Sequence, residues 1–226
     1  MSRHLVIALF LGTLLVSNTH AATKTHVISL GKTTITKFEV GPSADQYMSL
    51  KVRPLYVDAR LKEFTIGTPH DITDRLFVVR RAFRLNDNLP DESSATPRWQ
   101  WQRGGWLLVD RLTGRISPIN LPDFDTLVSA ASWYRDYIAY CGTSDDGKKL
   151  VAMVTQLGRR KPVLKKALAE GDAVNTATQE CSVPTWQRDP MRVTFESPDG
   201  KKQTFSIRGH AVDLVNDPED DSENSD

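Results

Sequence analysis

The chain has 226 residues, of which 39% are hydrophobic, 25% charged and 8% aromatic, a composition ordinary for a globular protein. Two cysteines are too few for a disulfide-dense miniprotein, and thirteen glycines without a period exclude collagen. The only long hydrophobic run lies at the N-terminus, which excludes a polytopic membrane protein.

The first residues predict a secretory signal peptide over residues 1–21. A short basic region around Arg3 precedes the apolar residues 5–16, which are too few to span a bilayer as a helix. Small and polar residues then lead to a cleavage site after Ala21. We therefore expect an exported protein, periplasmic or secreted, with no transmembrane anchor after cleavage. No cysteine directly follows the cleavage site, so a lipid anchor is not expected.

Alternation of apolar and polar residues predicts strands along the body of the chain, residues 24–215. The threonine-rich stretch 26–40 is typical of a hairpin that turns near Gly31. Residues 48–56 alternate clearly, and Pro54 within them favours an edge strand.

A further strand and three hairpins are predicted next. In residues 75–85 one side carries Phe77, Val79, Phe83 and Leu85, and the other carries Arg80 and Arg84. A polar loop then reaches Gln100. The hairpins pair 106–110 with 115–119, 137–141 with 149–157, and 191–196 with 203–208. One face of the third is expected to be covered by Val193, Phe195, Phe205 and Ile207.

Helix is scarce in these patterns. Pro162 stands at the first helical position of 162–170, and Gly171 follows that stretch. These residues are typical of the start and the end of a two-turn helix. Residues 125–135 fit either helical or strand spacing, and we favour the strand. The expected fold class is mostly β: a single antiparallel β domain, as a sandwich, a barrel or a partial propeller, with one short helix near 162–170.

One stretch, residues 106–157, resembles part of a β-propeller blade. It contains a D-x-x-T-G turn at residues 110–114, then a strand, then a hairpin of the form W…YIAY…DG…L that begins at Trp133. The resemblance covers barely more than one blade, whereas a complete propeller needs at least four blades of about 40 residues. The chain also resembles an uncharacterised group of exported bacterial proteins, which implies no activity.

The two cysteines predict a structural disulfide. Export would place Cys141 and Cys181 in an oxidising compartment, where a pair of cysteines is expected to form a bridge. Closing a loop of about 40 residues would stabilise the fold by roughly 4 kcal/mol. No CxxC spacing is present, so a structural role is favoured over a catalytic one.

The net charge of +1 conceals a basic body and an acidic tail. Residues 216–226 hold six acidic residues and no basic or apolar residue, so we expect this tail to be disordered. Without leader and tail, 28 basic and 22 acidic residues remain, a net charge of +6. Either the tail only aids solubility, or it shields a basic patch until an anionic partner displaces it. That patch is Arg159, Arg160, Lys161, Lys165 and Lys166.

The sequence contains no familiar catalytic or metal-binding motif. Only His26, His70 and His210 remain after the leader, and none has metal-ligand spacing, so no metal and no cofactor are expected. The best catalytic candidate is His70 with Asp71 and Asp74, because an imidazole near carboxylates can act as a general base. The alternative, which we favour, is a loop that caps the following strand.

Four of the five tryptophans lie between Trp99 and Trp133. Trp99 and Trp101 are two residues apart, so a strand places both on one face, beside Arg98 and Arg103. This arrangement predicts a ligand-binding platform on which a sugar, a peptide or an aromatic ligand could stack. The alternative is that the aromatic residues fill a β core. Trp99 and Trp101, next to the polar loop, are the pair expected to be exposed.

Together these observations favour an exported, non-catalytic binding or interaction module. An anionic or ring-stacking ligand fits the basic and aromatic residues, whereas nucleic acid is not expected, since no nucleic-acid-binding motif is present. The first alternative is a periplasmic or secreted hydrolase of envelope or extracellular polymers, because catalytic groups can assemble from distant positions. The second is a structural β module whose exposed strand edge awaits an oligomeric partner.

Overall fold

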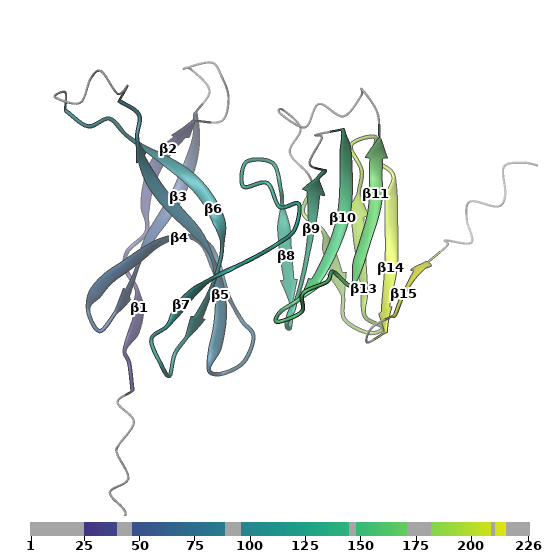
Figure 1. Ribbon diagram of the computed structural model, residues 1–226, viewed down its shortest axis with the longest axis horizontal. Helices are drawn as coiled ribbons and strands as arrows, with labels where there is room; N and C mark the ends of the chain where they lie inside the picture. Colours follow the sequence, from purple (N-terminus) through teal and green to yellow (C-terminus); the bar gives the residue numbers. More distant parts are fainter. Residues whose placement is uncertain are drawn as a thin grey trace, which may run out of the picture.

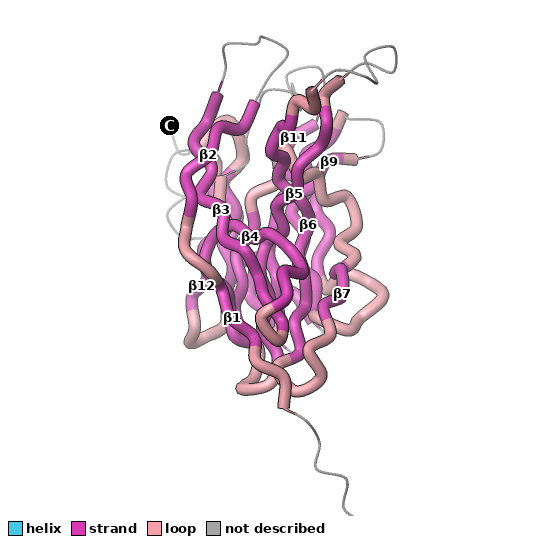
Figure 2. The backbone as a smooth tube through the Cα atoms, turned by 90° about the vertical axis from the view of Figure 1, so that its left-hand side faces the viewer, coloured by secondary structure: helices cyan, strands magenta, loops and turns pink. Residues whose placement is uncertain are grey.

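A computed structural model of the chain describes residues 25–39, 47–88, 96–144, 148–170, 182–208 and 211–215. This part of the chain consists of strands, turns and loops without a helix (Figure 2), and it therefore contains no helix that could span a membrane. The mostly β fold class is confirmed. The predicted signal peptide and the predicted acidic tail lie outside the described residues.

Fifteen strands are present in the described ranges. They are β1 (Ile28–Leu30), β2 (Thr34–Glu39), β3 (Tyr47–Val57), β4 (Arg60–Asp71), β5 (Leu76–Asn86), β6 (Trp99–Asp110), β7 (Ile116–Ile119), β8 (Ala131–Tyr134), β9 (Tyr137–Thr143), β10 (Lys149–Gln156), β11 (Leu164–Glu170), β12 (Thr185–Gln187), β13 (Arg192–Glu196), β14 (Lys202–Arg208) and β15 (Ala211–Val215).

The first seven strands build a barrel, drawn at the left of Figure 1. Strand β3 pairs with β2 and β4, β5 pairs with β4 and β6, and β6 pairs with β2, so β2 to β6 form a closed ring. Strand β1 pairs with β3, and β7 pairs with β6. The closure between β2 and β6 consists of one residue pair, Phe38 with Trp101. The barrel is therefore closed by a much shorter contact than joins its other strands.

The predicted hairpin over residues 26–40 is wrong. Strands β1 and β2 both pair with β3, one after the other, and not with each other. Gly31 marks the break: its N–H donates to the Pro54 carbonyl at 2.8 Å, and a Cβ there would lie 2.5 Å from Pro54 Cγ. Pro54 is thus inside the sheet, not on an edge strand. Its missing N–H faces the interruption between β1 and β2, where no strand partner is lost.

A β-bulge changes which residues of β5 face the barrel interior. The register between β5 and β6 shifts between Arg80 and Ala82, so Val79 and Ala82 are both buried although they are three residues apart. Phe83, expected on the same side as Val79, lies on the opposite face. The same shift places Arg84, two residues after Ala82, on the inner face.

The other eight strands form two four-stranded antiparallel sheets, the middle sheet (β8–β11) and the outer sheet (β12–β15). Figure 1 shows the middle sheet between the barrel and the outer sheet. The two sheets pack face to face through a buried core that consists of Ala139, Ala152, Val154, Leu164, Val193, Phe195, Phe205 and Ile207. The other face of the middle sheet, with buried Tyr140 and Met153, packs against Trp106 of the barrel.

The predicted hairpins 106–110 with 115–119, 137–141 with 149–157, and 191–196 with 203–208 are confirmed as β6–β7, β9–β10 and β13–β14. The four residues expected on one face of the third are all buried in the core between the two sheets. Within the stretch 125–135, residues 131–134 form β8, as favoured.

The predicted helix over residues 162–170 is wrong, because residues 164–170 form strand β11. Strand β10 offers it a paired neighbour, and Leu164 is buried in the core between the middle and outer sheets. Pairing and burial outweigh the helix propensity of its Lys, Ala and Leu residues.

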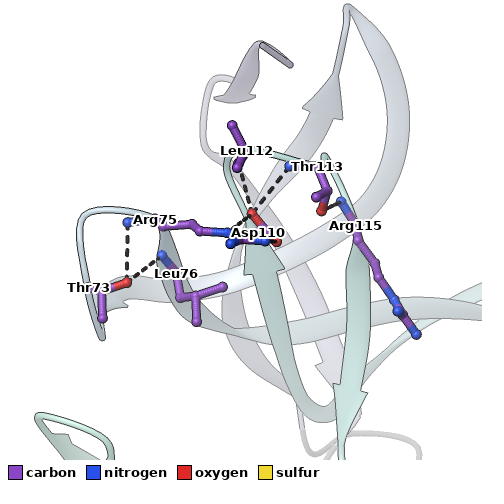
Figure 3. Close-up of polar contacts among 7 residues, drawn as sticks. All are labelled: Thr73, Arg75, Leu76, Asp110, Leu112, Thr113 and Arg115. Carbon is purple, nitrogen blue, oxygen red and sulfur yellow. Dashed lines mark hydrogen bonds and ion pairs between the residues drawn. The ribbon is translucent and has the colours of Figure 1, made fainter. Parts of the chain in front are cut away.

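Asp110 organises two turns at one end of the barrel (Figure 3). Its carboxylate accepts hydrogen bonds from Arg75 Nε at 2.9 Å and Nη2 at 2.5 Å, and from the N–H groups of Leu112 at 2.9 Å and Thr113 at 3.3 Å. Gly114 completes the D-x-x-T-G turn with a φ of 65°. This turn joins β6 to β7, so the stretch that resembles a propeller blade is divided between the barrel and the middle sheet.

The hydrogen bond from Arg75 holds the pKa of Asp110 well below its usual range. A carboxylate with a lowered folded-state pKa stabilises the fold above its unfolded pKa of about 3.9, and that contribution is lost as the pH falls further. We therefore expect Asp110→Asn to lower the thermal unfolding midpoint at pH 7, with a gap to wild type that narrows below about pH 4.

Thermal unfolding followed by circular dichroism between pH 2 and pH 7 measures this gap. Asp74→Asn is the control, because the Asp74 carboxylate has no ion pair among the described residues, and its midpoint should follow wild type. A gap for Asp110→Asn that stays constant across the pH range contradicts the assignment.

Candidate functional site

A groove of about 450 Å³ lies at the seam where β2 meets β6. Its lining comes from β2, β5, β6 and the residue before β6. We call it the mouth groove, and it is lined by Thr36, Lys37, Arg84, Arg98, Trp99, Gln100 and Trp101. Three of the four residues predicted to bind a ligand, Arg98, Trp99 and Trp101, are thus together.

Strand pairing gives the two tryptophans different environments. They share one face of β6, as their spacing predicted. Trp101 packs on the barrel core of Val52, Ile66 and Ala82, and its ring meets that of Phe64 edge-on at 5.1 Å. Trp99 is 56% exposed. The expectation of two exposed rings therefore holds for Trp99 only, while Trp101 joins the groove to the core.

Arg84 lies among three aromatic rings. It pairs with Trp101 across β5 and β6, and its Cζ lies 5.3 Å from the Trp101 ring centroid, 5.5 Å from that of Trp99 and 5.7 Å from that of Phe64. These distances are within the range of cation–π attraction. Among the described residues, Arg84 has no carboxylate or hydrogen-bond partner. The rings hold the guanidinium without occupying its N–H donors.

The groove is positively charged. Lys37, Arg84 and Arg98 line it, and no acidic side chain is among its lining residues. The carboxylate of Asp87 accepts a hydrogen bond from Nε2 of the lining residue Gln100 at 3.0 Å. Arg98 also donates from Nη2 to the Asp87 carbonyl at 3.3 Å. An anion entering the groove would therefore meet three cations.

Arg84, Lys37, Thr36 and Gln100 were not predicted as site residues. The β5–β6 pairing next to the polar loop places Arg84 opposite Trp101, and the β-bulge near residue 81 places Arg84 on the inner face, but the sequence alone does not show the bulge. Thr36 and Lys37 come from a strand far earlier in the chain, and barrel closure brings them to the groove.

Arg103, the fourth predicted ligand-binding residue, does not line the mouth groove. Its guanidinium lies 5.0 Å from the ring centroid of Phe38, and Nη2 donates to the Leu127 carbonyl. Arg80 makes a similar contact from the same barrel, donating to the Thr126 carbonyl at 2.8 Å. Both arginines therefore connect the barrel to the loop that precedes β8.

His70, Asp71 and Asp74 make structural contacts, and the two aspartates share Arg111 as a partner. His70 Nε2 donates to the Arg135 carbonyl at 2.8 Å, and its ring stacks on that of Trp133 at 6.0 Å. Asp71 accepts a hydrogen bond from Arg111 at 2.6 Å. The Asp74 carbonyl accepts another from Arg111 at 3.1 Å. Within the described ranges, no group of three or more His, Cys, Asp or Glu side chains could hold a metal ion.

The predicted basic patch lies on a different sheet from the mouth groove. Arg159, Arg160 and Lys161 are in the turn between β10 and β11, and Lys165 and Lys166 are on β11, an edge strand of the middle sheet. Lys165 Nζ lies 2.7 Å from a carboxylate oxygen of Asp123, so its charge is paired. Lysines on an edge strand also discourage pairing with another sheet.

The buried hydroxyl of Tyr140 in the middle sheet has a structural partner. Tyr140 donates its hydroxyl to the Pro122 carbonyl at 2.7 Å, and burial raises its pKa to about 12. The neighbouring Cys141 is buried and is not a free thiol. Cys181 lies outside the described residues, so the bridge between the two cysteines stays a prediction.

Comparison with known proteins finds no relative of this chain. No family model, no curated protein and no solved structure matches it. Its function is therefore inferred from the chemistry of the mouth groove.

Proposed function

We propose that the protein is a non-catalytic binding module that holds an anionic ligand in the mouth groove. The observation that carries this proposal is the setting of Arg84, whose guanidinium lies within 5.7 Å of three ring centroids and has no carboxylate partner among the described residues. Its planar fork of N–H donors matches a carboxylate, phosphate or sulfate. Aromatic contacts fix the fork before the ligand arrives, which reduces the entropy lost on binding.

The remaining lining residues fit the same ligand. Lys37 and Arg98 add positive charge, which attracts an anion and speeds encounter. The exposed ring of Trp99 offers a flat apolar surface beside these charges. Acid–base catalysis most often uses a histidine or a carboxylate at the reacting atoms, and neither kind of side chain is among the lining residues. Binding therefore fits the groove better than hydrolysis.

Export is part of the same proposal. A leader over residues 1–21 would deliver the module outside the cytoplasm, and a bridge between Cys141 and Cys181 would then stabilise it. The ligand is accordingly one that occurs in the periplasm or in the medium.

Arg84→Gln should weaken anion binding about tenfold, since one charge-assisted hydrogen bond is worth about 1.5 kcal/mol. The measurement is fluorescence anisotropy with fluorescein-labelled hexaglutamate at several salt concentrations. Wild-type affinity should fall as the salt concentration rises, because charge attraction drives binding.

Arg208→Gln is the matched control, since Arg208 is an exposed arginine on β14 and should leave the affinity unchanged. Lys37→Gln keeps the test valid if Arg84→Gln fails to fold, and it should also weaken binding. Hexaglutamate that binds all four proteins equally, or none, overturns the proposal.

Alanine substitutions of Trp99 and of Trp101 should have different effects on ligand binding and on stability. Trp99→Ala should change the free energy of unfolding by less than about 1 kcal/mol, because the ring is exposed, and should weaken hexaglutamate binding about fivefold. Trp101→Ala should cost about 3 kcal/mol of stability, since this ring packs on the barrel core. Urea unfolding and the anisotropy assay measure the two effects. If Trp99→Ala binds like wild type, the exposed ring is not part of the site.

A further inference from the structure

The seam beside the mouth groove leaves two strand edges without a partner. Strand β2 pairs with β3 along its whole length but with β6 at Phe38 only. The β6 edge that faces β2 is paired at Trp101, and its pairing with β7 begins only at Trp106. In the described residues, the β2 edge over 34–36 and the β6 edge at 99–100 therefore present backbone groups without a strand partner.

The mouth groove separates these two edges. Its lining contains Thr36 and Lys37 from β2 and Trp99 and Gln100 from β6. Backbone N–H and C=O groups along a strand edge are matched by the backbone of another extended peptide. A sugar has no comparable row of alternating donors and acceptors, so these edges favour a peptide among anionic ligands.

The side chains around the seam alternate in the way that an added strand requires. Arg84 and Trp101 face the interior side of the groove. Ile35 on β2 is 68% exposed and Leu85 on β5 is 51% exposed, on the outer side. Successive side chains of an inserted strand would point to these two sides in turn. Acidic residues would then meet Arg84, and apolar residues would lie near Ile35 and Leu85.

We infer that the anionic ligand is an extended acidic peptide segment that adds as a strand to the edge of β2 beside the mouth groove. This inference rests on the proposed function and names its ligand class. Main-chain hydrogen bonds to residues 34–36 would supply affinity, and the contact of Arg84 with carboxylates would supply specificity. The charges are complementary, because three cations and no acidic side chain line the groove.

The test uses the full chain and a labelled peptide, Glu-Val-Glu-Val-Glu-Val-Glu. In two further peptides, the backbone nitrogens of alternate residues are methylated. One of these peptides lacks the N–H donors of one strand edge, and the second lacks those of the other edge. A sulfated tetrasaccharide is the fourth probe. We expect the parent peptide to bind and at least one N-methylated peptide to bind tenfold or more weakly. We also expect hydrogen exchange at residues 34–36 to slow at least tenfold on binding.

Four other results would overturn the inference, and each has a different meaning for the proposed function. Equal binding of all three peptides, together with weaker binding by Arg84→Gln, removes strand addition and leaves the proposed function intact. Tighter binding of the tetrasaccharide than of the parent peptide assigns the groove to a sugar. If exchange at residues 34–36 slows with rising protein concentration in the absence of peptide, the edge is assigned to a second copy of the chain. If no anionic probe binds, the proposed function fails as well.

Discussion

The barrel closes through a single residue pair, Phe38 with Trp101, and this short closure creates the mouth groove. A longer pairing between β2 and β6 would fill the seam with ladder hydrogen bonds and cover the exposed ring of Trp99. Instead the strands diverge from that pair, and Arg84 occupies the inner face beside the opening. The extent of strand pairing thus decides where the molecule presents charge to a ligand.

The two ends of the β5–β6 pair use arginine in different ways. At one end, Arg75 is held by the carboxylate of Asp110 and Arg111 by that of Asp71. These arginines are neutralised and hold turns together. At the other end, Arg84 is held by aromatic rings, which attract a cation without cancelling its charge. The same side chain is therefore structural where it meets an acid and available to a ligand where it meets rings.

The sequence predicts much of the strand pattern but not the register. Period-2 alternation predicted the β13–β14 hairpin with its buried face, and the shared face of Trp99 and Trp101. The pattern gave wrong predictions where the structure of a segment depends on its pairing with another strand. The stretch 162–170 has helix-forming residues, yet β10 pairs with it as a strand. Arg84 was not predicted as a site residue, because the bulge near residue 81 reverses the faces of β5. No local sequence signal marks that bulge.

The central claim is that an anionic ligand contacts Arg84 and Trp99 in the mouth groove. The most direct measurement is the ¹H–¹⁵N spectrum of the five tryptophan indole N–H groups, assigned by single Trp-to-Phe variants, during titration with the acidic peptide. The account predicts that the signals of Trp99 and Trp101 shift, while those of Trp106, Trp133 and Trp186 stay in place. Shifts at those three tryptophans, with none at Trp99, would contradict it.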